Sequence, residues 1–148
     1  MFSQTTKICL KSLAFLVTKE RGSVVQSSEI AGRVGVSPTY VTKVFQPLCR
    51  QGWLRSIKGR TGGWVLDKDP SKLTLAQTVL VLDPEQQWRR CVIGHEICSG
   101  ETACPFHDTW VQAIEDFQQV MEATTLDRLP EFLPPCFDGR RDVQASAG

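Results

Sequence analysis

The chain has 148 residues, of which 41% are hydrophobic and 22% are charged, as in an ordinary globular protein. Its longest apolar stretch near the start, Ile8–Val17, is too short to cross a bilayer and is interrupted by Lys11 and Ser12. No small-residue cleavage site follows, so this stretch does not have the form of a signal peptide. The composition therefore excludes a membrane-spanning protein and predicts a cytoplasmic one with no membrane partner.

The net charge of +1 conceals a division of the chain into a basic and an acidic half. Residues 1–72 carry 12 Lys and Arg against 4 Asp and Glu, whereas residues 73–148 carry 5 against 12. Between Ile30 and Leu66 there are six basic residues and no acidic one. Such a split is typical of a basic face that meets a polyanion. Two halves that simply neutralise each other would give the same count.

The first 35 residues predict two helices. Apolar residues recur at helical spacing over residues 5–19, and Gly22 is expected to end that helix. A shorter helix over residues 28–34 follows, with Ser27 as its N-cap and Gly35 in the turn after it.

A third helix has the clearest start signal of the sequence, with Ser37 as N-cap and Pro38 in the first helical position. Its inward face is formed by four apolar residues at helical spacing, Val41, Val44, Phe45 and Leu48. Gly52 is expected to end the helix. Pro47 is expected to distort or shorten the last turns, because its ring removes one backbone hydrogen bond.

Two short strands are predicted over residues 53–57 and 63–66, joined by the glycine-rich basic tip Lys58–Gly63. Trp53 and Trp64 flank this tip and are expected to be core aromatics. Three helices followed by a basic hairpin predict a winged helix-turn-helix, a mainly α fold with a small β-hairpin wing. We assign this domain to residues 1–82, which include a short helix over residues 74–80 that packs back onto the first half.

In a winged helix-turn-helix, the third helix enters the major groove of double-stranded DNA and the wing reaches a neighbouring groove. The residues expected to contact DNA are Ser28, Ser37, Pro38, Thr39, Tyr40, Thr42 and Lys43 on the helices and Lys58, Arg60 and Gly62 on the wing. Two alternatives stay open: Tyr40 as a partly buried core residue, and the basic hairpin as a solvated turn.

Six cysteines are many for a cytosolic chain, and three of them cluster in the loop that we assign to residues 83–104. Cys91, Cys98 and Cys104, followed by His107, place four potential ligands within 17 residues. Thiolates with an imidazole suit an iron–sulfur cluster or a zinc ion, and unligated redox-active thiols are a third interpretation. The spacing does not separate them.

Other residues qualify this interpretation of the cysteines. His95 and Glu96 are alternative fourth ligands, and the isolated Cys9 and Cys49 are expected to be small core residues. An enzyme with a Cys104 nucleophile and a His107 base is disfavoured, because no third orienting group is evident. We therefore expect no enzymatic activity.

A long helix is predicted from about residue 105 to 125, with an apolar stripe wide enough to require a partner. The stripe consists of Phe106, Trp110, Ala113, Ile114, Phe117, Val120 and Met121. A homodimer is favoured over packing on the chain's own winged domain, because one small domain cannot easily cover so much apolar surface. We assign residues 105–129 to this dimerisation helix and its end, and residues 130–148 to a disordered tail.

Four features together resemble the bacterial family of winged-helix iron–sulfur transcriptional regulators, the IscR/NsrR/RirA-like proteins, over residues 2–129. They are the Val36–Val41 stretch VSPTYV, the Lys58–Trp64 stretch KGRTGGW, the three-cysteine loop with Cys104-x-x-His107, and the Thr125–Leu129 stretch TLDRL. The resemblance implies a homodimer with long crossed helices, a palindromic DNA site and a [2Fe–2S] or [4Fe–4S] cluster.

The resemblance also implies ligand roles for Cys91, Cys98 and Cys104, and His107 matches the fourth ligand of IscR-like members. NsrR-like members use an acidic residue near the start of the partner chain, whereas this sequence has none before Glu20. The function implied is a DNA-binding regulator, a repressor by analogy, whose cluster senses redox, nitric oxide or iron status. The alternative is a cofactor-free or zinc-containing winged-helix regulator with a thiol switch.

Overall fold

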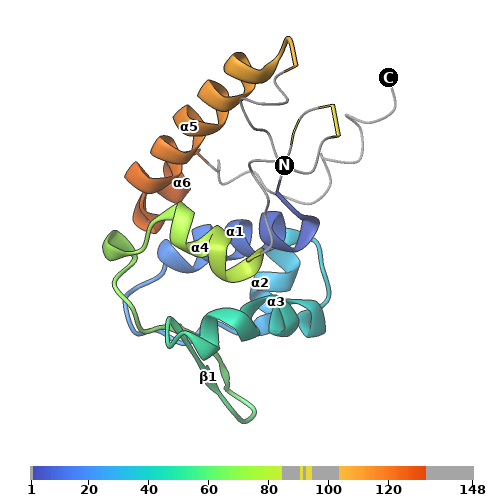
Figure 1. Ribbon diagram of the computed structural model, residues 1–148. Coiled ribbons are helices and arrows are strands. Elements are labelled where there is room, and N and C mark those ends of the chain that lie inside the picture. Colours follow the sequence, from blue (N-terminus) through green and yellow to red (C-terminus); the bar gives the residue numbers. More distant parts are fainter. Residues whose placement is uncertain (1, 85–90, 92, 95–103, 133–148) are drawn as a thin grey trace.

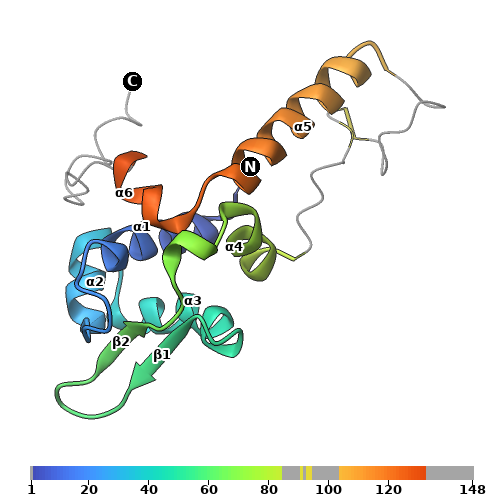
Figure 2. The ribbon, with the colours of Figure 1, turned by 90° about the vertical axis from the view of Figure 1, so that its left-hand side faces the viewer.

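The computed structural model describes residues 2–84, 91, 93–94 and 104–132 and confirms a mainly α-helical fold with a small β-hairpin. The elements are α1 (Gln4–Val17), α2 (Ser27–Val34), α3 (Pro38–Arg50), β1 (Leu54–Ile57), β2 (Gly63–Leu66), η1 (Pro70–Lys72), α4 (Leu75–Leu82), α5 (His107–Ala123), η3 (Leu126–Arg128) and α6 (Leu129–Phe132). The hairpin projects from one side of the packed helices, and α5 rises from the opposite side (Figures 1 and 2). No helix in these ranges is long and apolar enough to span a membrane.

The start of α3 is as predicted, whereas the start of α2 is not. The Ser37 side chain accepts a hydrogen bond from the Tyr40 backbone N–H at 3.2 Å, and Pro38 is the first helical residue. α2 begins at Ser27 itself, whose hydroxyl accepts a hydrogen bond from the Trp64 indole N–H at 2.8 Å. The prediction of Ser27 as N-cap is therefore wrong, because a residue far along the chain takes up its hydroxyl.

The C-terminal end of α3 contradicts the expectation that Pro47 shortens it. The helix continues through Pro47 to Arg50. Beyond it, Gly52 has a φ of 69°, its N–H bonds the Cys49 carbonyl at 2.9 Å, and the Trp53 N–H bonds the Leu48 carbonyl at 3.0 Å. This glycine-dependent pattern satisfies the last carbonyls of the helix and stabilises its end despite the proline.

The core of the winged domain lies where α1, α2 and α3 meet the hairpin. Val41, Val44, Phe45 and Leu48 are all buried, which confirms the predicted inward face of α3. The Trp64 ring packs edge-on against Phe45 with centroids 5.2 Å apart, and Trp53 is buried too. Both tryptophans are therefore core aromatics, as predicted.

The wing is fixed at its base by a third backbone segment. β1 and β2 pair antiparallel from Leu54 opposite Leu66 to Ile57 opposite Gly63. The Val25 backbone forms a bridge to Trp64 through two hydrogen bonds of 2.8 and 3.0 Å. The segment between α1 and α2 thus extends the hairpin and holds it against the helices.

The chain returns to the winged domain after α5. The segment just after α5 bridges the segment just before α4, with Leu75 N–H bonding Thr124 O and Leu126 N–H bonding Leu73 O, both at 2.9 Å. Leu126 and Leu129 are buried in the same core as α1. The far end of α5 is therefore anchored to its own chain.

The apolar stripe of α5 divides into a covered part and an exposed part. Ile114 and Met121 are buried, and α5 contacts α4 of the same chain. Phe106, Phe117 and Val120 remain exposed, and the Phe117 ring lies 5.8 Å from that of Phe2. Ile114 and Met121 are thus covered within the chain, because Leu126 and Leu129 anchor the C-terminal end of α5 to the winged domain.

Candidate nucleic-acid interface

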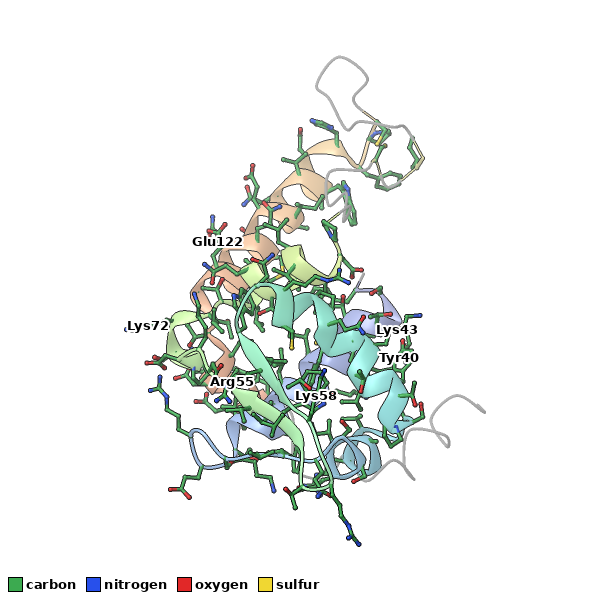
Figure 3. The ribbon with its side chains drawn as sticks, turned by 90° about the horizontal axis from the view of Figure 1, so that it is seen from below. Tyr40, Lys43, Arg55, Lys58, Lys72 and Glu122 are labelled. Atoms are coloured by element: carbon green, nitrogen blue, oxygen red, sulfur yellow. The ribbon has the colours of Figure 1, made fainter. Side chains whose placement is uncertain are left out.

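The N-terminal turn of α3 presents polar groups to solvent. Ser37, Pro38, Thr39 and Lys43 are exposed. Tyr40 and Lys43 lie on the face of the molecule that also shows the hairpin (Figure 3). α3 also contacts β1, so the recognition helix and the base of the wing are packed against each other.

Two of the expected contact residues on α3 are partly engaged within the protein. Tyr40 is half-buried, and its hydroxyl is hydrogen-bonded to the Thr5 hydroxyl of α1 at 3.2 Å. The Thr42 hydroxyl donates to the Pro38 carbonyl at 3.2 Å. The structure thus supports the alternative in which Tyr40 is partly a packing residue. On α2, Ser28 is exposed in the first turn.

The cations of the hairpin differ in their surroundings. Arg55, in β1, forms a two-pronged pair with Asp67, with Nε–Oδ2 at 3.0 Å and a second nitrogen at 3.1 Å from Oδ1. These hydrogen bonds and the Asp67 charge raise the pKa of Arg55. Lys58 and Arg60 at the tip are exposed and form no ion pair with any carboxylate of the described residues. Their charges are available for a partner.

Two glycines of the wing are required by close backbone contacts. A Cβ on Gly62 would lie 2.1 Å from the Ile57 carbonyl oxygen, and one on Gly63 would lie 2.2 Å from the Val25 carbonyl oxygen. The Gly62 N–H donates to the Gly59 carbonyl at 3.0 Å, which closes the tip. Steric fit therefore accounts for Gly62, which the sequence pattern assigns to DNA contact.

The predicted cysteine ligands are only partly within the described residues. Cys91 is buried, Cys104 is half-buried, and His107 is half-buried as the first residue of α5. The His107 N–H bonds the Cys104 carbonyl at 3.0 Å, so both residues lie in one turn. Cys98 and the alternatives His95 and Glu96 lie outside the described residues, as do most of the predicted cluster loop and most of the predicted tail. Among the residues described, no three His, Cys, Asp or Glu side chains meet as a metal site.

One polar cluster is not predicted by the sequence. The Asp83 carboxylate accepts hydrogen bonds from the Thr6 hydroxyl at 2.5 Å and from the Ser3 backbone N–H at 3.3 Å. These partners are about 80 residues apart in sequence, and no local pattern links them. Only the packing of α4 on α1 brings them together.

Comparison with known protein families identifies the family of this chain. A family model described as Rrf2, iron-dependent transcriptional regulator, matches residues 2–131. The chain belongs to the Rrf2 family. Rrf2 proteins are transcriptional regulators that bind DNA, so this chain is a DNA-binding transcriptional regulator of that family. Regulators of this kind are generally not enzymes.

Curated relatives agree with the Rrf2 assignment. A putative HTH-type transcriptional regulator of Aquifex aeolicus is 28% identical over 131 residues, which cover 87% of this chain and 90% of the relative. The HTH-type transcriptional regulator IscR of Photorhabdus laumondii is 29% identical over 105 residues, or 71% of this chain. The match spans only 63% of that IscR.

Solved structures share the fold of this Rrf2 chain. CymR of B. subtilis, described as its global cysteine regulator, superposes with a TM-score of 0.72 at 22% identity and covers 89% of this chain and 97% of CymR. IscR of T. potens gives a TM-score of 0.62 at 19% identity, covering 100% and 93% of the two chains. At these identities the likeness confirms the winged-helix architecture.

Proposed function

We propose that this Rrf2 protein binds a palindromic duplex sequence-specifically as a homodimer, and that an iron–sulfur cluster controls its DNA affinity. The observation that carries the DNA part is the face of the molecule that presents the start of α3 together with the hairpin (Figure 3). On it, Lys43, Lys58 and Arg60 are exposed and form no ion pair with a described carboxylate. Exposed cations on a recognition helix and a wing can neutralise the phosphates that border a DNA groove.

The start of α3 and the wing tip suit different contacts with DNA. The exposed hydroxyls of Ser37 and Thr39 at the start of α3 suit hydrogen bonds to base edges or phosphates. The wing cations Lys58 and Arg60 suit a neighbouring minor groove, whose negative potential is strongest where it is narrow. Ser28 at the start of α2 suits a phosphate contact through its hydroxyl and backbone N–H.

The dimer part of the proposal follows from the exposed stripe of α5. Phe106 is 58% exposed and Val120 is 60% exposed on a helix that leaves the packed domain (Figure 1). Apolar side chains of this size on one projecting helix favour burial against a second copy. A two-fold dimer places its recognition helices about one DNA turn apart, roughly 34 Å, and so specifies a palindrome.

The cluster part rests on the chemistry of the donors. Cys91, Cys98, Cys104 and His107 would hold the cluster, and thiolates with an imidazole are donors that iron–sulfur clusters accept. Cys104 lies just before the N-terminus of the 17-residue α5, and His107 is the first residue of that helix. When bound, the cluster supplies a centre that redox change, nitric oxide or iron supply alters. The chain's own contribution is to hold these donors between α4 and α5, so that their placement affects both helices.

The wing contact is tested by salt-dependent DNA binding. Arg60→Ala should weaken binding and reduce the slope of log affinity against log salt by about one charge. Arg55→Ala is the matched control, because Asp67 already pairs this guanidinium and the slope should change less. The duplex is one selected from a random library by the wild-type protein. Equal slopes for Arg60→Ala and wild type would show that the wing tip is not engaged.

The cluster is tested by the visible and Mössbauer spectra of protein purified without oxygen. We expect a brown protein whose absorption is lost in Cys104→Ser and kept in Cys49→Ser, since Cys49 belongs to α3. A protein with one zinc per chain and no visible absorption would contradict the cluster. A disulfide between Cys91 and Cys104, formed with an added oxidant and reversed by reductant, would support the thiol switch instead; mass spectrometry detects it as the loss of two hydrogen atoms.

A further inference from the structure

The carboxylate of Asp83 joins the ends of two helices. Its residue caps α4, with the Asp83 N–H bonding the Val79 carbonyl at 2.8 Å. Its side chain reaches the start of α1, where it accepts hydrogen bonds from the Ser3 N–H and the Thr6 hydroxyl. A negative charge at the N-terminus of a 14-residue helix is also favoured by the helix dipole. Asp83 therefore fixes the end of α4 to the first turn of α1.

The buried Thr6 hydroxyl makes the attachment of Asp83 to α1 costly to break. Thr6 is fully buried, and its oxygen also accepts a hydrogen bond from the Ser3 hydroxyl at 3.1 Å. A buried hydroxyl that loses its acceptor pays the cost of its desolvation, so the first turn of α1 follows Asp83 when Asp83 moves.

The same turn of α1 contacts the recognition helix. Thr5 is the neighbour of Thr6, and its hydroxyl is hydrogen-bonded to the Tyr40 hydroxyl at 3.2 Å. Tyr40 lies in the first turn of α3, two residues beyond Pro38 and directly beside the exposed Thr39. A displacement of the first turn of α1 is thus passed to the turn of α3 that faces DNA in the proposed function.

We infer that Asp83 is a positioning residue for the recognition helix. Through Thr6, Thr5 and Tyr40, it couples the end of α4, where the chain enters the cysteine-bearing segment, to the N-terminal turn of α3. The inference rests on the proposed function for the statement that this turn reads DNA. The coupling itself is a property of the described contacts and can be measured without DNA.

Tyr40 offers a selective probe, because it is the single tyrosine of the chain. Protein labelled with ¹³C at the tyrosine ring Cζ gives one resonance, which reports the hydrogen bond of the Tyr40 hydroxyl. We expect Thr5→Val to move this resonance directly and Asp83→Ala to move it from a distance. Asp83→Asn keeps an acceptor oxygen for Thr6 and should restore the resonance toward its wild-type position. Asp67→Ala removes a carboxylate on the wing side and should leave it unmoved.

DNA affinity provides the second measurement, with a duplex selected by the wild-type protein. Asp83→Ala and Thr5→Val should each weaken binding by about two- to tenfold, the range expected for the loss of one hydrogen bond. Because the contacts act in series, the double variant should bind no more weakly than the poorer single one. Independent sites would instead multiply their effects to within about twofold.

The coupling is overturned if folded Asp83→Ala leaves the Tyr40 resonance in place while Thr5→Val moves it. If Asp83→Ala does not fold, Thr6→Val, which keeps the side-chain volume and removes the hydroxyl, takes its place under the same criterion. Absence of DNA binding by the wild type would contradict the proposed interface, whereas the resonance would still decide the coupling.

A further measurement separates this inference from the proposed cluster. Ferrous iron and sulfide are added to the labelled protein without oxygen, and visible absorption is recorded beside the Tyr40 resonance. Absorption that develops together with a shift in wild type, and without one in Asp83→Ala, supports the coupling. Absorption with no shift in wild type overturns it. If no absorption develops, the cluster proposal is wrong and the variants alone decide.

Discussion

Single residues in this protein are constrained by backbone approach as much as by side-chain chemistry. Gly62→Ala would push a Cβ against the Ile57 carbonyl, whereas a Cβ on Gly32 in α2 meets nothing within 4 Å. Gly62→Ala should lower the free energy of unfolding by about 1–3 kcal/mol, as overpacking does. Gly32→Ala should raise it by roughly 0.5–1 kcal/mol, because alanine is the better helix former. Urea unfolding of both variants checks this, and equal effects would contradict the steric account.

The cysteines differ in reactivity for reasons of burial. Cys9 is fully buried and its thiol donates to the Val44 carbonyl at 3.7 Å, and this burial raises the pKa of the thiol far above its ordinary value. In metal-free protein, iodoacetamide should label the half-buried Cys104 well before Cys9, which reacts only after unfolding. Peptide mapping by mass spectrometry follows both sites in native buffer and in denaturant. Equal native rates at the two cysteines would refute the prediction.

At the scale of the elements, α3 shows which features a sequence carries locally. The Ser37 cap and the spacing of Val41, Val44, Phe45 and Leu48 are local signals, and the structure confirms them. The persistence of α3 through Pro47 depends on the burial of Leu48 and on the Gly52 end pattern. The Ser27 and Asp83 contacts depend on residues tens of positions away. Such pairings follow from packing, and no local pattern predicts them.

The proline in α3 leads to a prediction of its own. Pro47 lies inside α3, where it lacks the N–H that would bond the carbonyl four residues earlier. Pro47→Ala should raise the free energy of unfolding by about 1–2 kcal/mol, since the helix gain of roughly 3 kcal/mol is offset by a more flexible unfolded chain and lost contacts. Thermal and urea unfolding measure the change. A less stable variant would contradict this prediction and show that packing of the proline ring contributes more stability than the helix gains from alanine.

At the scale of the whole molecule, the charge division of the sequence corresponds to a division of surfaces. The basic first half forms the α3 and wing surface, and the hairpin and α5 point in opposite directions (Figure 2). The resemblance found in the sequence predicted this fold and its family correctly. The predicted set of metal ligands remains a prediction. Cys91, Cys104 and His107 do not form a three-ligand group in the described structure, and Cys98 lies outside it.

The proposed dimer makes the final prediction, at the exposed part of the α5 stripe. Val120 is 60% exposed, and its neighbour Gln119 is exposed as well. Val120→Glu should shift the protein from dimer to monomer, because a carboxylate buried between two apolar helices loses its hydration. Gln119→Glu adds the same charge one position away, outside the stripe, and should leave the dimer intact. Sedimentation velocity measures the mass of both variants, and circular dichroism verifies that each is folded. Since half-sites of a palindrome are bound together only by a dimer, Val120→Glu should also lose most of its affinity for the selected duplex. A Val120→Glu variant that stays dimeric would place the interface elsewhere.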